Sequence, residues 1–302
     1  MARNKKLQIK TEGRGIVFIA LGSPQYGRMA ANAAASIRFS DKEIKIHLVY
    51  TPGAITHLSE QHKALFSSME ECPQKYITKK GKQEYIKAKT CIYDLSPFDE
   101  TIMLDVDLVI FGGRSMSKLF DELSAQCDFT MQNRGFADLS KEQLDESYCM
   151  WCNIKEVKEA YELTDSRFYM LASEFVYFKR TDENKKFFNL VRQIYDKPKV
   201  NGLKFDSGLP DELAFDIAAA VLKKYPHMDG KVWIHWFAME GKMVWKEVLN
   251  NYYGYSVGGN QTPNDVKLRY EQLTKAHAIA LRLPYSYKLY PKKKWNLERI
   301  EI

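Results

Sequence analysis

The residues with the clearest chemical potential are Asp105 and Asp107, in the stretch Met-Leu-Asp-Val-Asp-Leu-Val-Ile at 103–110. Residues two apart on an extended strand point to the same face, so both carboxylates would be directed at one spot. Two like charges side by side are unstable without a positive charge between them. Mg²⁺ and Mn²⁺ prefer carboxylate oxygens and bind phosphate as well. The pattern predicts a metal–phosphate site at a strand end, with a strand-end turn or a solvated pair of aspartates as the alternatives.

The surrounding segments alternate between strand and helix patterns. Apolar runs predict buried strands, and periodic segments between them predict helices. This alternation is typical of an α/β sheet in which ligands bind beyond the carboxyl ends of the strands. Asp105 and the turn Ala20-Leu21-Gly22 both follow such ends. The expected strands are 15–22, 44–50, 75–78 and 101–105, and the expected helices are 27–38, 58–69 and 82–95.

The second half holds further acidic candidates. A strand expected at 168–179 carries Glu174 in an otherwise apolar stretch. A helix expected at 210–224 opens with Pro210, Asp211 and Glu212, an arrangement that suits the first turn of a helix and its dipole. The two acids therefore have either this structural role or a role at the site.

Composition limits the function classes. The chain has 302 residues, 45% hydrophobic, with a net charge of +7. The moderate positive charge suits an anionic ligand such as a nucleotide, and the dispersed lysines argue against a nucleic-acid binder. No apolar run is long enough for a membrane span. Five cysteines with no apolar leader predict reduced thiols and a cytoplasmic protein.

The stretch Lys-Thr-Cys-Ile-Tyr-Asp-Leu-Ser-Pro-Phe-Asp at 89–99, followed by the strand and Asp-x-Asp, resembles the central motif of GT-A-fold glycosyltransferases. The closest resemblance is to nucleotide-diphospho-sugar transferases of the glycogenin and galactosyltransferase type. It covers residues 15–113 well, continues more weakly through Asp211-Glu212, and is thin beyond Met228. The resemblance implies a mixed, mostly parallel central sheet flanked by helices. It also implies one GT-A-like domain over 1–302, with a nucleotide-sugar and metal-binding half at 15–113, an acceptor half at 114–240 and a C-terminal extension at 241–302.

The resemblance also implies roles for individual residues. Asp105 and Asp107 would hold Mn²⁺ or Mg²⁺ against the diphosphate of a nucleotide-sugar donor, with a UDP-sugar expected. Lys89 would approach the donor phosphates or ribose. One of Asp211, Glu212 and Glu174 would act on the sugar or the acceptor hydroxyl. The nucleotide would lie against residues of the first strand and its turn, namely Ala20, Leu21, Gly22 and Tyr26.

A late histidine often completes the metal shell in this family. His277, which precedes a basic aromatic tail, is the expected ligand, and His235 in an aromatic stretch is the alternative. The family's final Lys-Pro-Trp and its Asn-x-Gly are absent, and Ala172-Ser173-Glu174 occupies the place of the latter.

The sequence therefore predicts a metal-dependent glycosyltransferase whose acceptor, a glycan, a protein or a modified base, is open. Two other functions compete with this one. A catalytically degenerate binding or structural protein would keep the fold without turnover. A metal-dependent nucleotidyltransferase would be expected to carry a basic glycine-rich loop after the first strand, and residues 22–27 contain no Lys or Arg.

Overall fold

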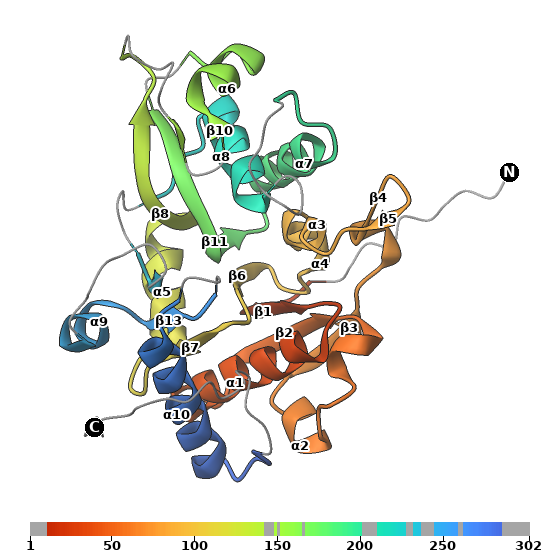
Figure 1. Ribbon diagram of the computed structural model, residues 1–302, viewed down its shortest axis with the longest axis vertical. Coiled ribbons are helices and arrows are strands. Elements are labelled where there is room, and N and C mark those ends of the chain that lie inside the picture. The colour runs from red at the N-terminus through yellow and green to blue at the C-terminus, as the bar shows by residue number, and fades with distance from the viewer. Residues whose placement is uncertain are drawn as a thin grey trace, which may run out of the picture.

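The computed structural model describes residues 11–141, 148–149, 152–164, 167–200, 210–227, 232–236, 245–258 and 262–285. Its centre is a six-stranded sheet in the order β3-β2-β1-β6-β11-β8 (Figure 1). Strands β3, β2, β1 and β6 are parallel, and β11 is antiparallel to both of its neighbours. The expected mixed, mostly parallel sheet is confirmed. The strands are β1 (Arg14–Ala20), β2 (Lys45–Tyr50), β3 (Ser68–Glu71), β6 (Glu100–Leu104), β8 (Phe129–Asp138) and β11 (Arg167–Lys179).

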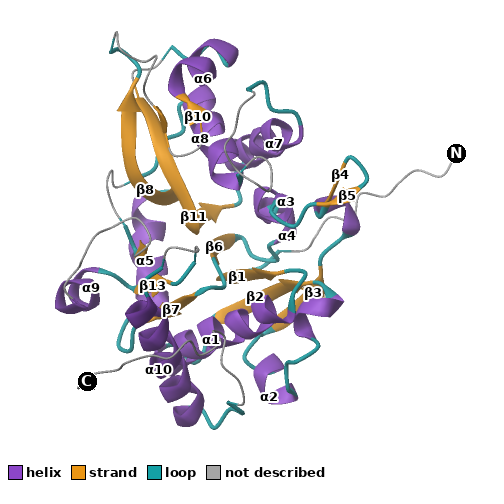
Figure 2. Ribbon diagram, in the orientation of Figure 1, coloured by secondary structure: helices purple, strands orange, loops and turns teal. Residues whose placement is uncertain are grey.

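Helices cover both faces of this sheet (Figure 2). One apolar cluster joins β1 and β6 to the alanine-rich α1 and to α5, and the other joins the opposite face to α3, α4, α7 and α8. The helices are α1 (Pro24–Ser40), α2 (Glu60–Lys63), α3 (Lys87–Thr90), α4 (Ile92–Leu95), α5 (Met116–Gln126), α6 (Ile154–Ala160), α7 (Asp182–Asp196), α8 (Asp211–Leu222), α9 (Trp245–Asn251) and α10 (Asn264–Ala280).

Helix α1 begins where the chain leaves β1, and its first turn is fixed locally. Ser23 is the N-cap and accepts a hydrogen bond from the backbone N–H of Gln25, and Pro24 occupies the first turn. Gly27 lies against the neighbouring 3₁₀ turn η1 (Pro52–Ile55), where an added Cβ would be 2.0 Å from the carbonyl oxygen of Ala54. The helix therefore approaches the loop after β2 closely.

A second, three-stranded sheet lies beside the end of β6. It contains β12 (Ile234–Trp236), β13 (Gly254–Ser256) and β7 (Leu108–Ile110) in the order β12-β13-β7. Strand β13 is antiparallel to β7, which directly follows the Asp-x-Asp turn. Strand β13, about 150 residues later in the sequence, therefore lies next to the Asp-x-Asp turn.

Three expected elements between β2 and β6 differ from the structure in type or extent. The expected helix 58–69 is the single turn α2 followed by β3, which is the third parallel strand in place of 75–78. Residues 74–76 form the 3₁₀ turn η2 (Gln74–Tyr76). The expected helix 82–95 begins as β5 (Lys82–Gln83), the second strand of a hairpin with β4 (Thr78–Lys79). Lys80 and Gly81 have φ of 50° and 77° and form the two-residue turn of this hairpin, so the helical part of 82–95 is limited to α3 and α4.

Two small strands complete the described structure, β9 (Tyr148–Cys149) and β10 (Cys152–Asn153). No helix in the described ranges combines the length and the hydropathy that crossing a membrane requires.

Candidate active site

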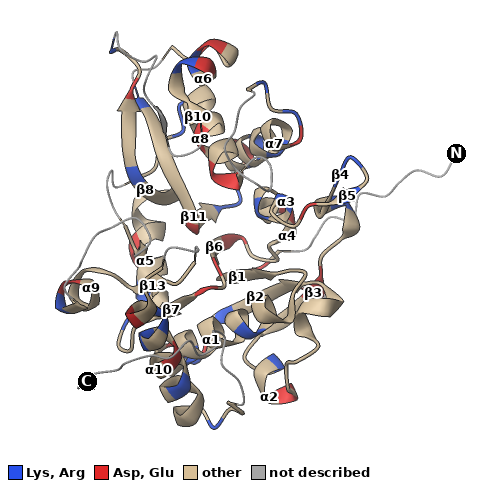
Figure 3. Ribbon diagram, viewed as in Figure 1, with Lys and Arg blue, Asp and Glu red and all other residues tan. Residues whose placement is uncertain are grey.

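A cavity of about 590 Å³ opens at the carboxyl ends of β1 and β6. Five residues that the sequence singled out line it: Leu21, Tyr26, Lys89, Asp105 and Asp107. The other lining residues are Gln83 at the end of β5, Glu84, Tyr85 and Ile86 directly after it, Ile19 on β1, and Val106 between the two aspartates. Acidic positions after β6 and at the first turn of α8 lie toward the middle of the molecule (Figure 3). The cavity therefore combines an aromatic and apolar side with an acidic end.

The turn after β1 is held by backbone contacts. Gly22 has φ of 75°, and its N–H donates to the hydroxyl of Thr51 at 2.8 Å. An added Cβ on Gly22 would be 2.8 Å from the Tyr85 ring, so this glycine lets Tyr85 lie against the turn. Ala20 is buried at the end of β1, and its carbonyl oxygen accepts from the Thr51 N–H. Tyr26, on α1, is 47% exposed, which leaves its ring available to a ligand.

Asp105 and Lys89 form the polar centre of the cavity. Strand β6 ends at Leu104, and the N–H of Asp105 then donates to the carbonyl oxygen of Glu174 on β11 at 3.2 Å. The Lys89 ammonium lies 2.6 Å from Asp105 Oδ1 and 3.8 Å from Asp211 Oδ2. Burial lowers the pKa of Lys89, but the carboxylates of Asp105 and Asp211 outweigh it and raise the pKa overall. Lys89 therefore carries a permanent charge between two acidic groups.

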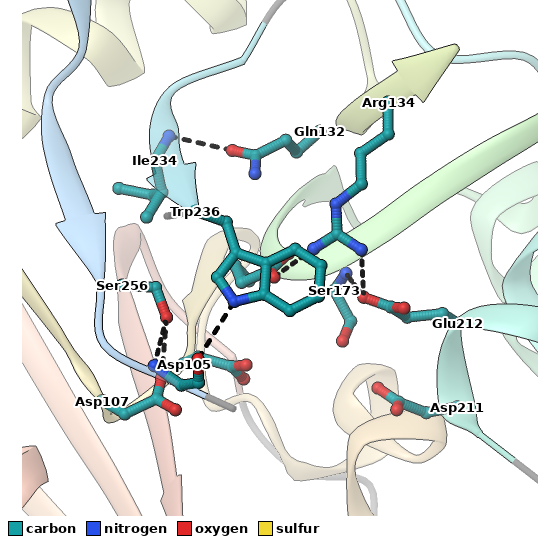
Figure 4. Close-up of polar contacts among 12 residues, drawn as sticks. Asp105, Asp107, Gln132, Arg134, Ser173, Asp211, Glu212, Ile234, Trp236 and Ser256 are labelled. Atoms are coloured by element: carbon teal, nitrogen blue, oxygen red, sulfur yellow. Dashed lines mark hydrogen bonds and ion pairs between the residues drawn. The ribbon is translucent and has the colours of Figure 1, made fainter. Parts of the chain in front are cut away.

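Asp107 is attached to the C-terminal part of the chain. Its backbone carbonyl accepts from the Val257 N–H at 2.8 Å, and the Ser256 hydroxyl donates to its Oδ1 at 3.4 Å (Figure 4). Gly258 lies so close that an added Cβ would be 2.4 Å from Asp107 Oδ2. Burial, with the neighbouring Asp105 carboxylate, raises the pKa of Asp107 to about 7.

The two aspartates fit a hard divalent cation. Burial and the Asp105 carboxylate both disfavour the ionised form of Asp107, whose Oδ1 has a long hydrogen bond to Ser256. A bound cation would stabilise that ionised form and offset the repulsion between the two carboxylates. Within the described ranges no three His, Cys, Asp or Glu side chains are grouped to hold a metal. Among the described residues, Asp105 and Asp107 are the carboxylates on the cavity that would hold such a cation.

A second acidic group lies across from Asp105, on β11 and α8. Strand β11 shifts register against β8 between Ala172 and Val176, and this bulge contains Ser173 and Glu174. Glu212 Oε1, in the first turn of α8, accepts from the Ser173 N–H at 3.3 Å. Burial raises the pKa of Glu212 to about 8, and the Glu174 carboxylate adds to the shift. The structure therefore brings Glu174 and Asp211 into contact with Asp105 and Lys89, and Glu212 into contact with the segment that carries Glu174.

Arg134 on β8 joins these acids. Its guanidinium forms an ion pair with Glu174 and contacts Glu212 Oε1 at 3.4 Å. The guanidinium carbon also lies 4.2 Å from the centre of the Trp236 ring. Trp236 Nε1 donates to the carbonyl oxygen of Gly258 at 3.1 Å, so contacts run continuously from Glu174 to the Asp107 turn (Figure 4).

The two histidine candidates lie elsewhere. His277 is near the end of α10, where its ring centre lies 5.1 Å from that of Phe39 in the last turn of α1. It is 13 residues beyond Asn264, the first residue of α10, or about 20 Å along the axis. His235 is fully buried, with its ring 4.8 Å from Tyr252. The structure brings neither histidine together with Asp105 and Asp107.

Sequence reasoning missed four residues of this site: Tyr85, Arg134, Trp236 and Ser256. Tyr85 was missed because the sequence predicts one continuous helix over 82–95. The other three reach the site through tertiary contacts, since β8, β12 and β13 are far from residue 105 in the sequence.

Comparison with solved structures assigns the fold to the GT-A-like class, as expected from the sequence. Comparison with family models and with curated proteins gave no match. The bifunctional glycosyltransferase WbbM is similar, with a TM-score of 0.54 and 11% identity over 83% of this chain and 46% of WbbM. The galactosyltransferase LgtC, solved with donor and acceptor sugar analogues, has a TM-score of 0.51 and 14% identity over 87% of this chain and 95% of its own. The chain spans about half the length of WbbM, and at these identities the likeness concerns the fold.

Proposed function

We propose that this protein transfers a sugar from a nucleotide diphosphate donor to a hydroxyl-bearing acceptor, with a divalent cation held by Asp105 and Asp107. The observation that carries the proposal is the Asp-x-Asp turn on a cavity of about 590 Å³, opposite Lys89 and beside the acids of α8. The GT-A-like fold supports it, because two similar structures are glycosyltransferases by title.

The aromatic side of the cavity suits the nucleotide. Tyr26 and Tyr85 offer ring faces to a base, and the backbone of Leu21 and Gly22 frames the same region. We assign this side to the nucleoside of a UDP-sugar. Asp105 and Asp107 would hold Mn²⁺ or Mg²⁺ against the diphosphate. Such a cation would neutralise the phosphates and stabilise the departing nucleoside diphosphate.

The acidic end of the cavity suits the sugar and the acceptor. Lys89 would hold Asp105 and Asp211 in place and add a positive charge near the phosphates. If transfer inverts the anomeric centre, Asp211 or Glu212 would take the proton of the acceptor hydroxyl. If transfer retains it, a carboxylate among Glu174, Asp211 and Glu212 would stabilise the positive charge that develops on the sugar.

The proposal can be tested by ligand-induced stabilisation. Unfolding temperatures would be measured for the wild type and Asp107→Ala, with and without Mn²⁺, in the presence of UDP, GDP or CDP. A ligand that binds only the folded state raises its stability. We expect a manganese-dependent increase with UDP that disappears in Asp107→Ala. Release of UDP from a UDP-sugar by the wild type would then separate an enzyme from a binding protein.

Two results would contradict this function. A wild type that shows no manganese-dependent increase with any of the three nucleotides has no donor site. A wild type that binds UDP and Mn²⁺ but releases no UDP from any UDP-sugar, with water or added glycans as acceptor, is a binding protein with this fold.

A further inference from the structure

One acidic side chain lines the cavity beside the ring that the nucleoside would contact. Glu84 and Tyr85 follow β5 directly, and both line the cavity. Glu84 is half-buried, so its carboxylate is neither a solvated surface group nor enclosed in the core. A carboxylate accepts hydrogen bonds and donates none, so Glu84 can recognise a ligand through the O–H or N–H groups of that ligand.

Tyr195 on α7 orients this carboxylate. Its side chain is fully buried, and its hydroxyl donates to Glu84 Oε1 at 3.0 Å. Burial, together with the negative charges of Glu84 and Asp211, raises the pKa of the Tyr195 phenol, so the hydroxyl keeps its proton and remains a donor. A carboxylate has about four acceptor positions on its two oxygens, so the bond from Tyr195 leaves acceptor capacity for a ligand in the cavity.

The segment that carries Glu84 is fastened to the same end of α7. Lys79 on β4 donates to the carbonyl oxygen of Tyr195 at 2.5 Å, and its ammonium lies 4.3 Å from the centre of the Tyr195 ring. Lys87, three residues after Glu84, forms an ion pair with Asp196 at 3.0 Å. These contacts on both sides of Glu84 hold its backbone against α7, while the Tyr195 hydroxyl holds its side chain.

The chemistry of a nucleoside diphosphate limits what Glu84 would bind. Phosphate oxygens are negatively charged acceptors, which a carboxylate repels, and the proposed cation at Asp105 and Asp107 would attract them. The donors of a uridine nucleoside are the two ribose hydroxyls and the N3–H of the base. A hydrogen bond from one of these donors to a carboxylate is charge-assisted and therefore stronger than one between neutral groups.

We infer that Glu84 accepts a hydrogen bond from the nucleoside of the donor, through a ribose hydroxyl or the N3–H of the base, and that Tyr195 is the positioning residue that orients Glu84. This inference rests on the proposed function and deepens it, because it assigns the residue that recognises the nucleoside.

The test compares UDP with three analogues that each lack one donor: 2′-deoxy-UDP, 3′-deoxy-UDP and N3-methyl-UDP. Affinities would be measured by calorimetry with Mn²⁺ for the wild type and Glu84→Ala. We expect Glu84→Ala to bind UDP about 10-fold more weakly than the wild type. For one analogue, the wild type should bind about 10-fold more weakly than it binds UDP, whereas Glu84→Ala should show a difference below about 2-fold. That analogue identifies the ribose hydroxyl or the base as the group that Glu84 contacts.

Tyr195→Phe tests the positioning role, because it keeps the Glu84 carboxylate and removes the hydroxyl that orients it. We expect it to weaken UDP binding about 3-fold. It should cause no further loss in the double variant with Glu84→Ala, since a residue that acts through Glu84 has no effect once Glu84 is gone. A loss that adds to that of Glu84→Ala would overturn the positioning role.

A matched pair at the other end of β6 provides the controls. The hydroxyl of the fully buried Tyr177 donates to Glu100 Oε1 at 2.5 Å, so Tyr177→Phe and Glu100→Ala make the same changes away from the cavity. Both should leave all four affinities unchanged.

Two further results would contradict the inference. No binding of UDP by the wild type would overturn the proposed function and this inference together. A wild type that binds UDP, with a Glu84→Ala variant that binds UDP equally well or distinguishes the three analogues as the wild type does, would overturn this inference alone.

Discussion

Glu212→Gln should stabilise the ligand-free protein at high pH. Glu212 is 8% exposed, and burial with the repulsion of Glu174 raises its pKa to about 8 from an ordinary value of 4.5. The folded protein thus binds this proton more tightly than the unfolded chain. Its contribution to stability is full below pH 4.5 and is lost as the pH rises through 8. An amide has the same shape and does not ionise, so the variant escapes this loss.

The size of the effect follows from the same pKa values. If Glu212 alone accounted for the rise of its pKa from 4.5 to about 8, the wild type would lose about 5 kcal/mol of its free energy of unfolding by pH 9. Because Arg134 offsets part of the repulsion and Glu174 shares the proton, we expect about 2 kcal/mol at pH 9 and less than about 0.5 kcal/mol at pH 4.5. The Gln oxygen can still accept from Ser173 and Arg134, so the contacts at Oε1 are kept.

Urea unfolding at pH 4.5, 7 and 9, followed by tryptophan fluorescence, would measure the free energy of unfolding of both proteins. Glu183→Gln, an exposed position on α7, is the matched control and should show no pH-dependent difference. An equal difference at all three pH values, or a variant less stable than the wild type at pH 9, would refute the reasoning. Either result would show that repulsion among the buried carboxylates does not destabilise the folded protein at high pH.

Three further predictions concern other contacts. Gly258→Ala should weaken Mn²⁺ binding in the presence of UDP by about 10-fold in calorimetry, because the new Cβ would be 2.4 Å from Asp107 Oδ2; unchanged affinity would contradict this. Burial lowers the pKa of His47 to about 4, so stability should fall by up to about 3 kcal/mol as the pH drops from 6.5 to 4 in acid unfolding, and His47→Gln should flatten this fall. Gly27→Ala should lower the free energy of unfolding by about 2 kcal/mol in urea, because its Cβ would overlap the Ala54 carbonyl; a neutral effect would show that α1 can shift.

The sheet was predictable where the hydrophobic pattern is strong. The runs that became β1, β2, β6 and β11 are apolar on both faces, and burial between two layers of helices requires such runs. Strand β3 was missed because it is an edge strand of four residues with little apolar character. The hairpin at Lys80-Gly81 was missed because a short turn inside a lysine-rich segment has no periodicity to oppose a helix.

Only the part of the site that comes from residues 89–107 was predictable from the sequence. Asp105, Asp107 and Lys89 lie within 19 residues of one another, and the motif that joins them was readable. The histidine was sought from its position late in the chain, but α10 carries His277 along α1, away from the turn. Arg134 and Trp236 had no signal, because a lone arginine in a strand and a tryptophan near the end of a domain have many other uses.

The segment expected to be a C-terminal extension contacts the Asp-x-Asp turn, and these contacts help to hold the acidic residues of the site in position. Strand β13 is hydrogen-bonded to β7, and Val257, Ser256 and Gly258 contact Asp107 directly. On the other side, Trp236 connects Gly258 to Arg134. Like charges at the site repel one another, so their positions depend on surrounding contacts rather than on mutual attraction. The late strands supply those contacts for Asp107, while the β11 bulge supplies them for Glu174, which explains why both aspartates can face one cavity although β6 ends before the first of them.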